Sequence, residues 1–501
     1  AGWNADIAKL TNQWDDGDTS VTLIDVGRQL DSNVILEDLR QTSPIALAGS
    51  TTDFKAVIKN ASNEAAESSQ ATLFVNGSPQ TIAIPPIPAN ESIDIPLRLD
   101  FSDAGRQKIR LELPNDLVEA DNSRFVIVDV QPSISIVMVD GDPRAVAFQS
   151  ETDFLAASCR AGRAPWQADV VQSMTEVNFE EVRPNVLVLA NVGTIERDDA
   201  IRIEKLVNEG MGLIVYTGEL IDPESYNSAL YKNGTGLLPA ELKESAQDEF
   251  SGLTIESLGE SPLEILTRLS TAVLGRIKPT TIYRVAGYEN PDTRVLGTWK
   301  GPDPAPALLE KRVGQGRVFL WTVSADRAWS DWPQEPSFVL AMRQTVQYAS
   351  AQTVNRANVL TGQELQTQLR VTEAPANAKA TAPGYDEEFE LTVESTEDGP
   401  LMEFTDTNRS GFYQFLWDDR DGQKQTDEFA VNVDARESDA TRLAEEKLDT
   451  FLGDIDWRLL SIGSAEVNVG DQAELWRTGA MIFLGLIGCE SIFAAWIGRE
   501  R

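Results

Sequence analysis

Residues 134–143 read ISIVMVDGDP, residues 184–193 read PNVLVLANVG and residues 212–218 read GLIVYTG. Each segment opens with an almost unbroken apolar run and closes near Gly, Asn or Asp, which is typical of a strand buried on both faces. Residues 152–161 and 197–209, which have helical periodicity, lie between them. Strands and helices that alternate in this way predict an open parallel sheet with flanking helices.

The predicted α/β domain extends over residues 131–355. Its later part, APALLEKRVGQGRVFLWTV at 305–323, supplies two strands joined by a glycine-containing turn, and residues 339–350 supply a closing helix. Residues 233–300 are rich in Gly, Glu and Ser, so we expect them to form an insertion.

Two regions with a different pattern flank this domain. Residues 33–130 and 356–435 contain short segments of period-two alternation, such as DFKAVIKN at 53–60, each closed by Asn, Gly, Pro or Asp. Such segments predict two antiparallel β-sandwiches, and the expected fold class is therefore multidomain α/β plus all-β. For the first sandwich a spacer role is favoured, and binding of a carbohydrate or peptide at its edge is the alternative.

The two ends of the chain carry further elements. Residues 1–32 lack an initial Met and an apolar leader and run through an amphipathic helix into a strand, SVTLIDVG at 20–27. We expect them to be the tail of an α/β domain in a processed product or a fragment. Residues 436–478 are predicted to form a helical stalk and linker, with Ser438 and Asp439 capping the helix.

Residues 479–498 read GAMIFLGLIGCESIFAAWIG and are long enough, as a helix, to cross a bilayer. Arg477 and Trp496 suit the two membrane interfaces, and two arginines in the tail favour its placement in the cytoplasm. The expected location is the inner membrane, crossed once by this chain, with the bulk of the protein in the periplasm. A buried core helix is the alternative.

Within this predicted transmembrane helix, Glu490 lies where an isolated carboxylate is costly and needs a polar partner. Gly485 and Cys489 have the spacing of small residues that lets two helices approach closely. We therefore expect these three residues to contact a partner helix. The predicted partners are other membrane proteins and the lipid bilayer.

Composition excludes several classes of function. The chain has 501 residues, of which 79 are acidic and 43 basic, and its formal charge of −36 argues against nucleic-acid binding. It contains no His, which removes the commonest general base and metal ligand. Its two cysteines, Cys159 and Cys489, are too few for a disulfide framework, and Cys159 is expected to be a buried apolar residue. We therefore expect a protein that is not an enzyme.

Acidic and amide side chains follow the predicted strands at Asp140, Asp142, Asn191, Glu219 and Asp326. Ligands in such sheets lie beyond the carboxyl ends of the strands, and carboxylate oxygens suit Mg²⁺ or Ca²⁺. The favoured interpretation is that these residues make turns and helix caps, and a ligand or cation site is the alternative. No Gly-rich phosphate loop occurs in the domain, and the sequence assigns no metal and no cofactor.

Several segments resemble one family of membrane proteins. They are AGWNADIA, TLIDVGRQLDSNVILEDLR, IVMVDGDP, VLVLANVGTI, EGMGLIVYTGE, YNSALYKNGTGLLPA, GQGRVFLWTVSADRAWSDWP and FAVNVDARESDATRL. They are similar to planctomycete membrane proteins related to the Bat aerotolerance group, and the parts around Asp326 and Glu437 are the most specific. The resemblance implies, in order, the end of a von Willebrand factor A domain, an immunoglobulin-like domain, a class I glutamine amidotransferase-like domain and a C-terminal transmembrane helix.

The resemblance also limits what this chain can do. The metal-binding DxSxS motif of the A domain would lie upstream of residue 1, so no metal is credited to this chain. An active amidotransferase needs a Cys at a sharp strand-to-helix turn and a His nearby. Here Gly218 and Glu219 occupy that turn, and the chain has no His.

Two functions from different classes follow. The first is a non-catalytic, membrane-anchored scaffold or interaction protein outside the cytoplasm, in a complex similar to those associated with MoxR-type ATPases. The second is a carboxylate-dependent hydrolase or sugar-binding protein that uses Asp140, Asp142, Glu219 and Asp326. The second predicts an open, aromatic-lined cleft over the strand ends, whereas dispersed carboxylates on a closed surface would exclude it.

Overall fold

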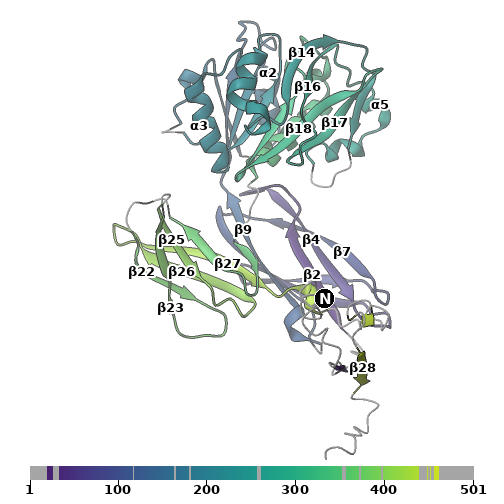
Figure 1. Ribbon diagram of the computed structural model, residues 1–501, viewed down its shortest axis with the longest axis vertical. Coiled ribbons are helices and arrows are strands. Elements are labelled where there is room, and N and C mark those ends of the chain that lie inside the picture. Colours follow the sequence, from purple (N-terminus) through teal and green to yellow (C-terminus); the bar gives the residue numbers. More distant parts are fainter. Residues whose placement is uncertain are drawn as a thin grey trace, which may run out of the picture. The chain divides into compact units, whose positions relative to one another are not determined.

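The computed structural model describes residues 20–25, 33–116, 118–162, 165–179, 182–256, 261–351, 357–369, 371, 374–396, 399–438, 448–449, 452 and 456–461 (Figure 1). The chain divides into two compact units, one of Ala1–Asp31 with Asp439–Arg501 and one of Ser32–Ser438. The second unit contains one α/β domain and two all-β domains. The predicted class, a mixed multidomain α/β plus all-β fold, is confirmed.

The first all-β domain packs two sheets face to face. One sheet has the order β2-β4-β7 and the other the order β3-β9-β8-β5-β6, and a short helix, η1, precedes β9. Side chains alternate between core and solvent along β4, where Phe54, Ala56 and Ile58 are buried. The bounds are β2 Val34–Gln41, β3 Ala46–Leu47, β4 Thr51–Asn60, β5 Ser69–Val75, β6 Ser78–Ile84, β7 Ser92–Asp100, β8 Gly105–Glu112, η1 Glu119–Asp121 and β9 Ser123–Gln131.

The α/β domain is built on an eight-stranded sheet of order β11-β10-β12-β13-β19-β18-β17-β15. The first five strands in this order run parallel, and the last three continue the sheet with antiparallel pairing. The bounds are β10 Ile134–Asp140, β11 Trp166–Val171, β12 Val186–Ala190, β13 Gly212–Tyr216, β14 Glu241–Gln247, β15 Gly252–Ile255, β16 Thr281–Ala286, β17 Thr293–Lys300, β18 Ala305–Val313 and β19 Gly316–Trp321.

This sheet corrects two expectations. It is mixed and not wholly parallel, because the tight turn between β18 and β19 reverses the chain direction. Residues 233–300 are not simply an insertion, because β17 and β15 extend the main sheet and only β14 and β16 form a separate two-stranded sheet. The Gly and Glu content that suggested an insertion did not reveal strand pairing, since pairing depends on distant partners.

Helices cover both faces of the sheet. The order β11-β10-β12-β13 means that the chain moves outward from β10 in opposite directions, so right-handed crossovers put α2 and α3 on opposite faces. Helix α6 packs against α2, β13 and β19, and Pro336 suits its first turn. The bounds are α2 Asp153–Arg160, η2 Met174–Glu176, α3 Arg197–Asn208, α4 Pro223–Tyr226, η3 Asn227–Tyr231, η4 Lys232–Gly234, η5 Glu264–Arg268, α5 Thr271–Leu274, η6 Trp332–Gln334 and α6 Pro336–Ser350.

The second all-β domain also has two sheets, of order β20-β27-β26-β22-β23 and β21-β25-β24. Its core contains Phe415 and Phe429, whose ring centroids are 4.7 Å apart. A short helix, η7 (Ala435–Ser438), follows it. The bounds are β20 Asn358–Leu360, β21 Leu365–Gln368, β22 Ala376–Thr381, β23 Phe389–Glu390, β24 Thr392–Thr396, β25 Gly399–Phe404, β26 Gly411–Asp418 and β27 Lys424–Asn432.

In the other unit, β1 (Ser20–Asp25) pairs in parallel with β28 (Asp456–Ser461). This pairing corrects the expectation that residues 436–478 are only a helical stalk and linker. A parallel partner lies far away in sequence, so the local pattern did not reveal the strand. The segment 479–498, with Gly485, Cys489 and Glu490, lies outside the described residues. Within the residues that are described, no helix is both long and apolar enough to cross a membrane.

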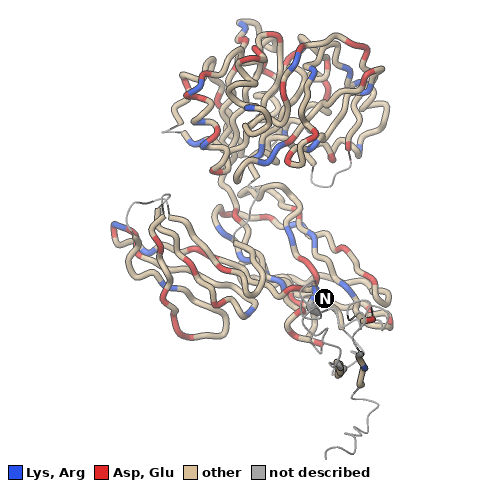
Figure 2. Tube along the Cα trace, in the orientation of Figure 1, with Lys and Arg blue, Asp and Glu red and all other residues tan. Residues whose placement is uncertain are grey.

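Acidic and basic residues are interspersed over all three domains of the larger unit, and Figure 2 shows no single region that collects the acidic excess.

Candidate functional site

The strand order of the α/β domain places a site at the carboxyl ends of β10 and β12. The chain leaves β10 toward β11 on one side and continues from β12 to β13 on the other, and ligands in such sheets bind where this reversal occurs. Asn191 follows β12 in the left-handed conformation, with φ of 51°. A Cβ at Gly141 would lie 2.0 Å from the carbonyl oxygen of Asn191, and one at Gly218 would lie 2.2 Å from its Cγ. Glycine is therefore required on both sides of Asn191.

Asn191 connects two loops through its side chain. Its Nδ2 donates a hydrogen bond to Oε1 of Glu151 (2.8 Å), and its Oδ1 accepts one from the backbone N–H of Leu220 (2.9 Å). Glu151 lies in the loop between β10 and α2 and is only 3% exposed. Its second oxygen, Oε2, has no hydrogen-bond partner. The site thus buries a carboxyl group of which only one oxygen is paired.

Burial raises the pKa of Glu151 to about 8, and the negative charge of Asp326 acts in the same direction. The hydrogen bond from Asn191 opposes this rise, and the nearby backbone N–H of Ala325 also lowers the pKa. Glu151 is therefore mostly a neutral carboxylic acid at pH 7, with one hydrogen to donate.

Asp140 organises the loop beneath the site. It is 3% exposed, and its two oxygens accept hydrogen bonds from Thr152 Oγ1 (2.7 Å) and from the backbone N–H of Asp142 (3.2 Å). Burial raises the pKa of Asp140, while the Thr152 hydroxyl opposes that rise. Since both oxygens are engaged, Asp140 holds the loop and offers little to a ligand.

Above these groups lies a cavity of about 320 Å³. Its lining includes three carboxylates (Asp142, Glu219 and Asp326), two arginines (Arg144 and Arg327) and two aromatic side chains (Phe148 and Trp329), and Glu151 also contributes to the lining. Asp142 pairs with Arg144, which donates from Nε at 2.9 Å. Asp326 Oδ1 accepts hydrogen bonds from Ser324 Oγ (2.7 Å) and from the backbone N–H of Ala328 (2.9 Å).

The structure brings all five residues singled out in the sequence to one edge of the sheet. Asp142, Glu219 and Asp326 line the cavity, whereas Asp140 and Asn191 are buried and shape the loops. Sequence reasoning missed Glu151. It stands just before α2, where an acidic residue is ordinary, and only the packing around it makes it distinctive.

Cys159, the cysteine among the described residues, is not an activated nucleophile. Burial raises the pKa of Cys159 to about 12, so the thiol stays protonated on the buried face of α2. The turn after β13 carries Gly218 and Glu219. Within the described residues, no three His, Cys, Asp or Glu side chains converge as metal ligands would.

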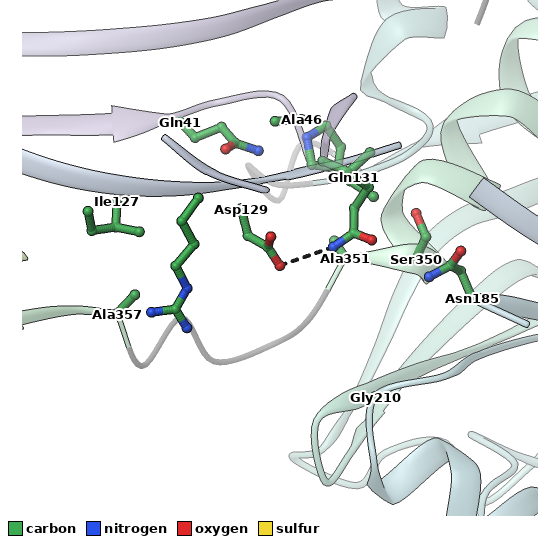
Figure 3. A pocket seen from close by; sticks show the side chains of 13 residues that line it. Gln41, Ala46, Ile127, Asp129, Gln131, Asn185, Gly210, Ser350, Ala351 and Ala357 are labelled. Atoms are coloured by element: carbon green, nitrogen blue, oxygen red, sulfur yellow. Dashed lines mark hydrogen bonds between the residues drawn. The ribbon is translucent and has the colours of Figure 1, made fainter. Parts of the chain in front are cut away.

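A second cavity, of about 200 Å³, lies where the first all-β domain meets the α/β domain (Figure 3). Its walls are mostly polar and include Gln131, which donates a hydrogen bond to Asp129 Oδ2 (3.0 Å), as the dashed line in Figure 3 shows. Asn185 and Ser350 line it from the α/β domain. Because these residues surround the points where the chain crosses between domains, we interpret this cavity as part of the domain boundary.

Comparisons with known proteins give likenesses to solved structures only. No family model matches the chain, and no curated protein matches it. The chain is similar to a cytoplasmic protein from Salmonella typhimurium LT2 (13% identity, 43% of this chain and 99% of that chain, TM-score 0.34). It is also similar to a ThuA-like protein from Bacteroides uniformis ATCC 8492 (10% identity, 43% and 90%, TM-score 0.30). A third likeness is to the CARDB domain of a Pyrococcus furiosus protein (12% identity, 21% and 94%, TM-score 0.19). At these values the function has to be argued from the residues themselves.

Proposed function

We propose that this chain is a non-catalytic scaffold or interaction protein, in which two all-β domains form a firm support. The observation that carries the proposal is the junction between β9 of the first all-β domain and β20 and β27 of the second. A support of this kind fixes the separation between contact surfaces, which an interaction protein needs and a flexible linker does not provide.

Two asparagines satisfy the exposed edge of β9. On this edge β9 pairs only with the two residues of β3, at Val130 and Gln131, so the earlier backbone groups lack a strand partner. Asn432 accepts a hydrogen bond from the N–H of Phe125 (2.8 Å) and donates one to its carbonyl (2.8 Å). Asn358 does the same for Ile127, at 2.8 and 2.9 Å. Each side-chain amide thus replaces the peptide group of a neighbouring strand.

Arginine and apolar contacts reinforce this junction. Arg124 is 5% exposed and donates from Nε to the carbonyl of Leu36 (2.7 Å) and from Nη1 to the carbonyl of Val433. Beside it Ile127, Ala357 and Ala430 form a small buried cluster. Since the buried polar groups of β9 are paired and the arginine joins both domains, bending at this point would break several hydrogen bonds at once.

We further propose that residues 479–498 anchor this support in the inner membrane, with the described domains in the periplasm and a short tail in the cytoplasm. Glu490, with Gly485 and Cys489, would then contact helices of partner proteins, in a complex similar to those of Bat-related proteins and MoxR-type ATPases. The anchor is supported by the sequence of the segment, which is apolar over a length that can cross a bilayer and has Arg477 and Trp496 near its ends.

The scaffold is tested by loosening the junction. We expect that membranes carrying the double variant Asn358→Ala and Asn432→Ala, after chemical cross-linking, yield fewer cross-links to partner proteins in mass spectrometry than the wild type. Gln425→Ala on β27 is the matched control, because its side chain bonds to Asp419 within its own domain. An unchanged set of cross-links in the double variant would contradict the proposal.

The anchor has its own test. Detergent, but not high salt, should release the full chain from membranes, and a chain ending at Glu474 should be soluble. Release of the full chain by salt would refute the anchor. Glu490→Leu should weaken co-purification of membrane partners if the carboxylate contacts them.

A carboxylate-dependent hydrolase or sugar-binding protein is the second candidate. The observation in its favour is that Glu151, whose pKa burial raises to about 8, shares a cavity with the carboxyl group of Asp326, because a carboxyl group kept neutral can act as a general acid. Turnover of aryl glycosides that is lost in both Glu151→Gln and Asp326→Asn would favour this candidate. Turnover that survives both substitutions would come from a contaminant.

A further inference from the structure

We propose that the strand-end cavity of the α/β domain binds a primary ammonium group, carried either by a small alkylamine or by a lysine side chain of a partner protein. This proposal does not depend on the scaffold, because it rests on different residues. Three features carry it: a buried carboxyl oxygen without a partner, two carboxylates without an ion pair, and an aromatic wall.

The buried carboxyl is the first feature. Glu151 is held at one oxygen by Asn191 and contributes to the cavity lining, while Oε2 is buried and has no partner in hydrogen-bond geometry, although the backbone N–H of Ala325 is near the carboxyl group. An unpaired buried oxygen costs on the order of 1–3 kcal/mol, so a ligand that donates a hydrogen bond to it recovers this cost. An ammonium group has three such donors.

The electrostatics of the cavity favour a cation. Among the described residues, Glu219 and Asp326 have no ion-pair partner, whereas Asp142 is already neutralised by Arg144. The pKa of Arg144 is raised chiefly by its hydrogen bond with Asp142, and the charges of Glu219 and Asp326 add to this rise. The same two carboxylates therefore attract positive charge into the cavity. Arg327 pairs instead with Asp331 (3.5 Å).

The arrangement suits an organic cation better than a metal ion. A hard divalent ion needs six or more oxygen atoms converging at about 2.0–2.6 Å, whereas no three acidic groups among the described residues are placed to hold a metal ion. An ammonium reaches its acceptors through hydrogen bonds of about 2.8 Å in separate directions. Phe148, 54% exposed, and Trp329, 6% exposed, line the cavity and offer apolar surface to the carbon chain of an amine.

Binding should release a proton. Glu151 faces Asp140 at the end of β10 and Asp326 after β19, and the other charged groups that line the cavity are Asp142, Arg144, Glu219 and Arg327. With the cavity empty, burial keeps Glu151 neutral at pH 7. A bound ammonium stabilises the carboxylate, so the carboxyl proton leaves to solvent as the amine, already protonated, enters.

The test is isothermal titration calorimetry of the full chain with n-butylammonium, in phosphate and in MOPS at pH 7 and in borate and in CHES at pH 9. We expect release of about one proton per amine at pH 7 and much less at pH 9, since Glu151 then is largely ionised before binding. Asp326→Asn and Glu219→Gln should each weaken binding about tenfold, as for loss of one charge-assisted hydrogen bond. Glu151→Gln should abolish proton release. Glu244→Gln, exposed on β14 and absent from the cavity, should leave all values unchanged.

Two further titrations show whether the ammonium group belongs to a small amine or to a lysine side chain, and whether its charge is needed for binding. Binding of N-acetyl-lysine N-methylamide with the same variant dependence would assign the site to a partner's lysine, while binding of butylammonium alone would assign it to a small amine. Binding of neutral 1-butanol as tight as that of the amine, or unchanged amine binding in both Asp326→Asn and Glu219→Gln, would overturn the proposal. Glu219 is exposed, so its variant should fold normally. These outcomes do not bear on the scaffold proposal, which is tested by the junction variants Asn358→Ala and Asn432→Ala.

Discussion

The β9 junction and the strand-end cavity bury polar groups in opposite ways. At the junction, Asn358 and Asn432 pair every backbone group that they cover on β9. In the cavity, Glu151 is more deeply buried than either asparagine, yet one of its oxygens is unpaired. Complete pairing stabilises a fixed arrangement, whereas incomplete pairing retains a cost that a ligand with a hydrogen-bond donor can remove. The degree to which buried polar groups are paired therefore distinguishes the structural contact at the junction from the proposed binding site in the cavity.

The largest expected effect comes from the unpaired carboxyl. The pKa of Glu151 is about 8 in the folded chain against an ordinary value of 4.5, so between these pH values the folded state binds more protons than the unfolded state. Stability should therefore fall as pH rises through this window, by at most on the order of 5 kcal/mol, and level off above it. Glu151→Gln should flatten the profile. Urea unfolding at pH 5, 7 and 9 measures this.

The composition of the chain leaves few other groups to contribute to this pH dependence of stability. The chain has no histidine, so few other side chains titrate in the same window, although Asp140 also has a raised pKa. Glu244→Gln should keep the wild-type slope. If Glu151→Gln also keeps it, Glu151 is not the buried acid that distinguishes the cavity from the junction.

The second effect concerns the loops that frame the cavity. Gly141→Ala should destabilise the α/β domain by about 3 kcal/mol, because the new Cβ would lie 2.0 Å from the carbonyl oxygen of Asn191 and backbone would have to move. Gly49→Ala, in open space with φ of 72°, should cost only about 1 kcal/mol through its backbone conformation. If urea unfolding gives the same loss of stability for both variants, the loops around Asn191 can move to accept the new Cβ at position 141.

The third effect tests the junction. Asn432→Ala should cost about 2 kcal/mol, because it leaves the N–H and carbonyl of Phe125 without partners. Gln425→Ala on the same strand should cost less than about 0.5 kcal/mol. Hydrogen exchange at Phe125 and Ile127 measures the loss locally. Protection that survives Asn432→Ala would show that water replaces the amide and that the junction is not firm.

The sequence predicts the strands that form the cavity edge of the α/β domain. The parallel strands β10, β12 and β13 are almost wholly apolar, and Gly, Asn or Asp stands at or just after the end of each, so their pattern alone predicts both the strands and the edge at which Asp142, Glu219 and Asp326 gather. The location follows from local sequence because the carboxyl ends of parallel strands share one edge.

The remaining features depend on contacts between distant segments. Glu151 is distinctive only because Asn191 and Asp326 approach it from other strand ends. The pairing of β1 with β28 joins residues more than 400 positions apart. Asn432 resembles any polar residue at the end of a strand until β9 lies beside it. Periodicity reports the environment of a residue along its own element, and it carries no information on which remote group completes a hydrogen bond.

The smallest effect sharpens the difference between a structural contact and a binding contact. Phe148 has φ of 62°, a conformation that costs a bulky residue about 1 kcal/mol or more, and its ring is exposed at the cavity apart from contact with Phe154 at 5.2 Å between centroids. Phe148→Gly should therefore change the free energy of unfolding by less than about 1 kcal/mol, because relief of strain offsets the lost contact. The same substitution should weaken binding of n-butylammonium about threefold to tenfold, since it removes part of the apolar wall. Urea unfolding and calorimetry on one preparation give both numbers. A clear loss of stability with unchanged amine binding would mean that the ring serves packing and that its strained backbone has no role at the cavity.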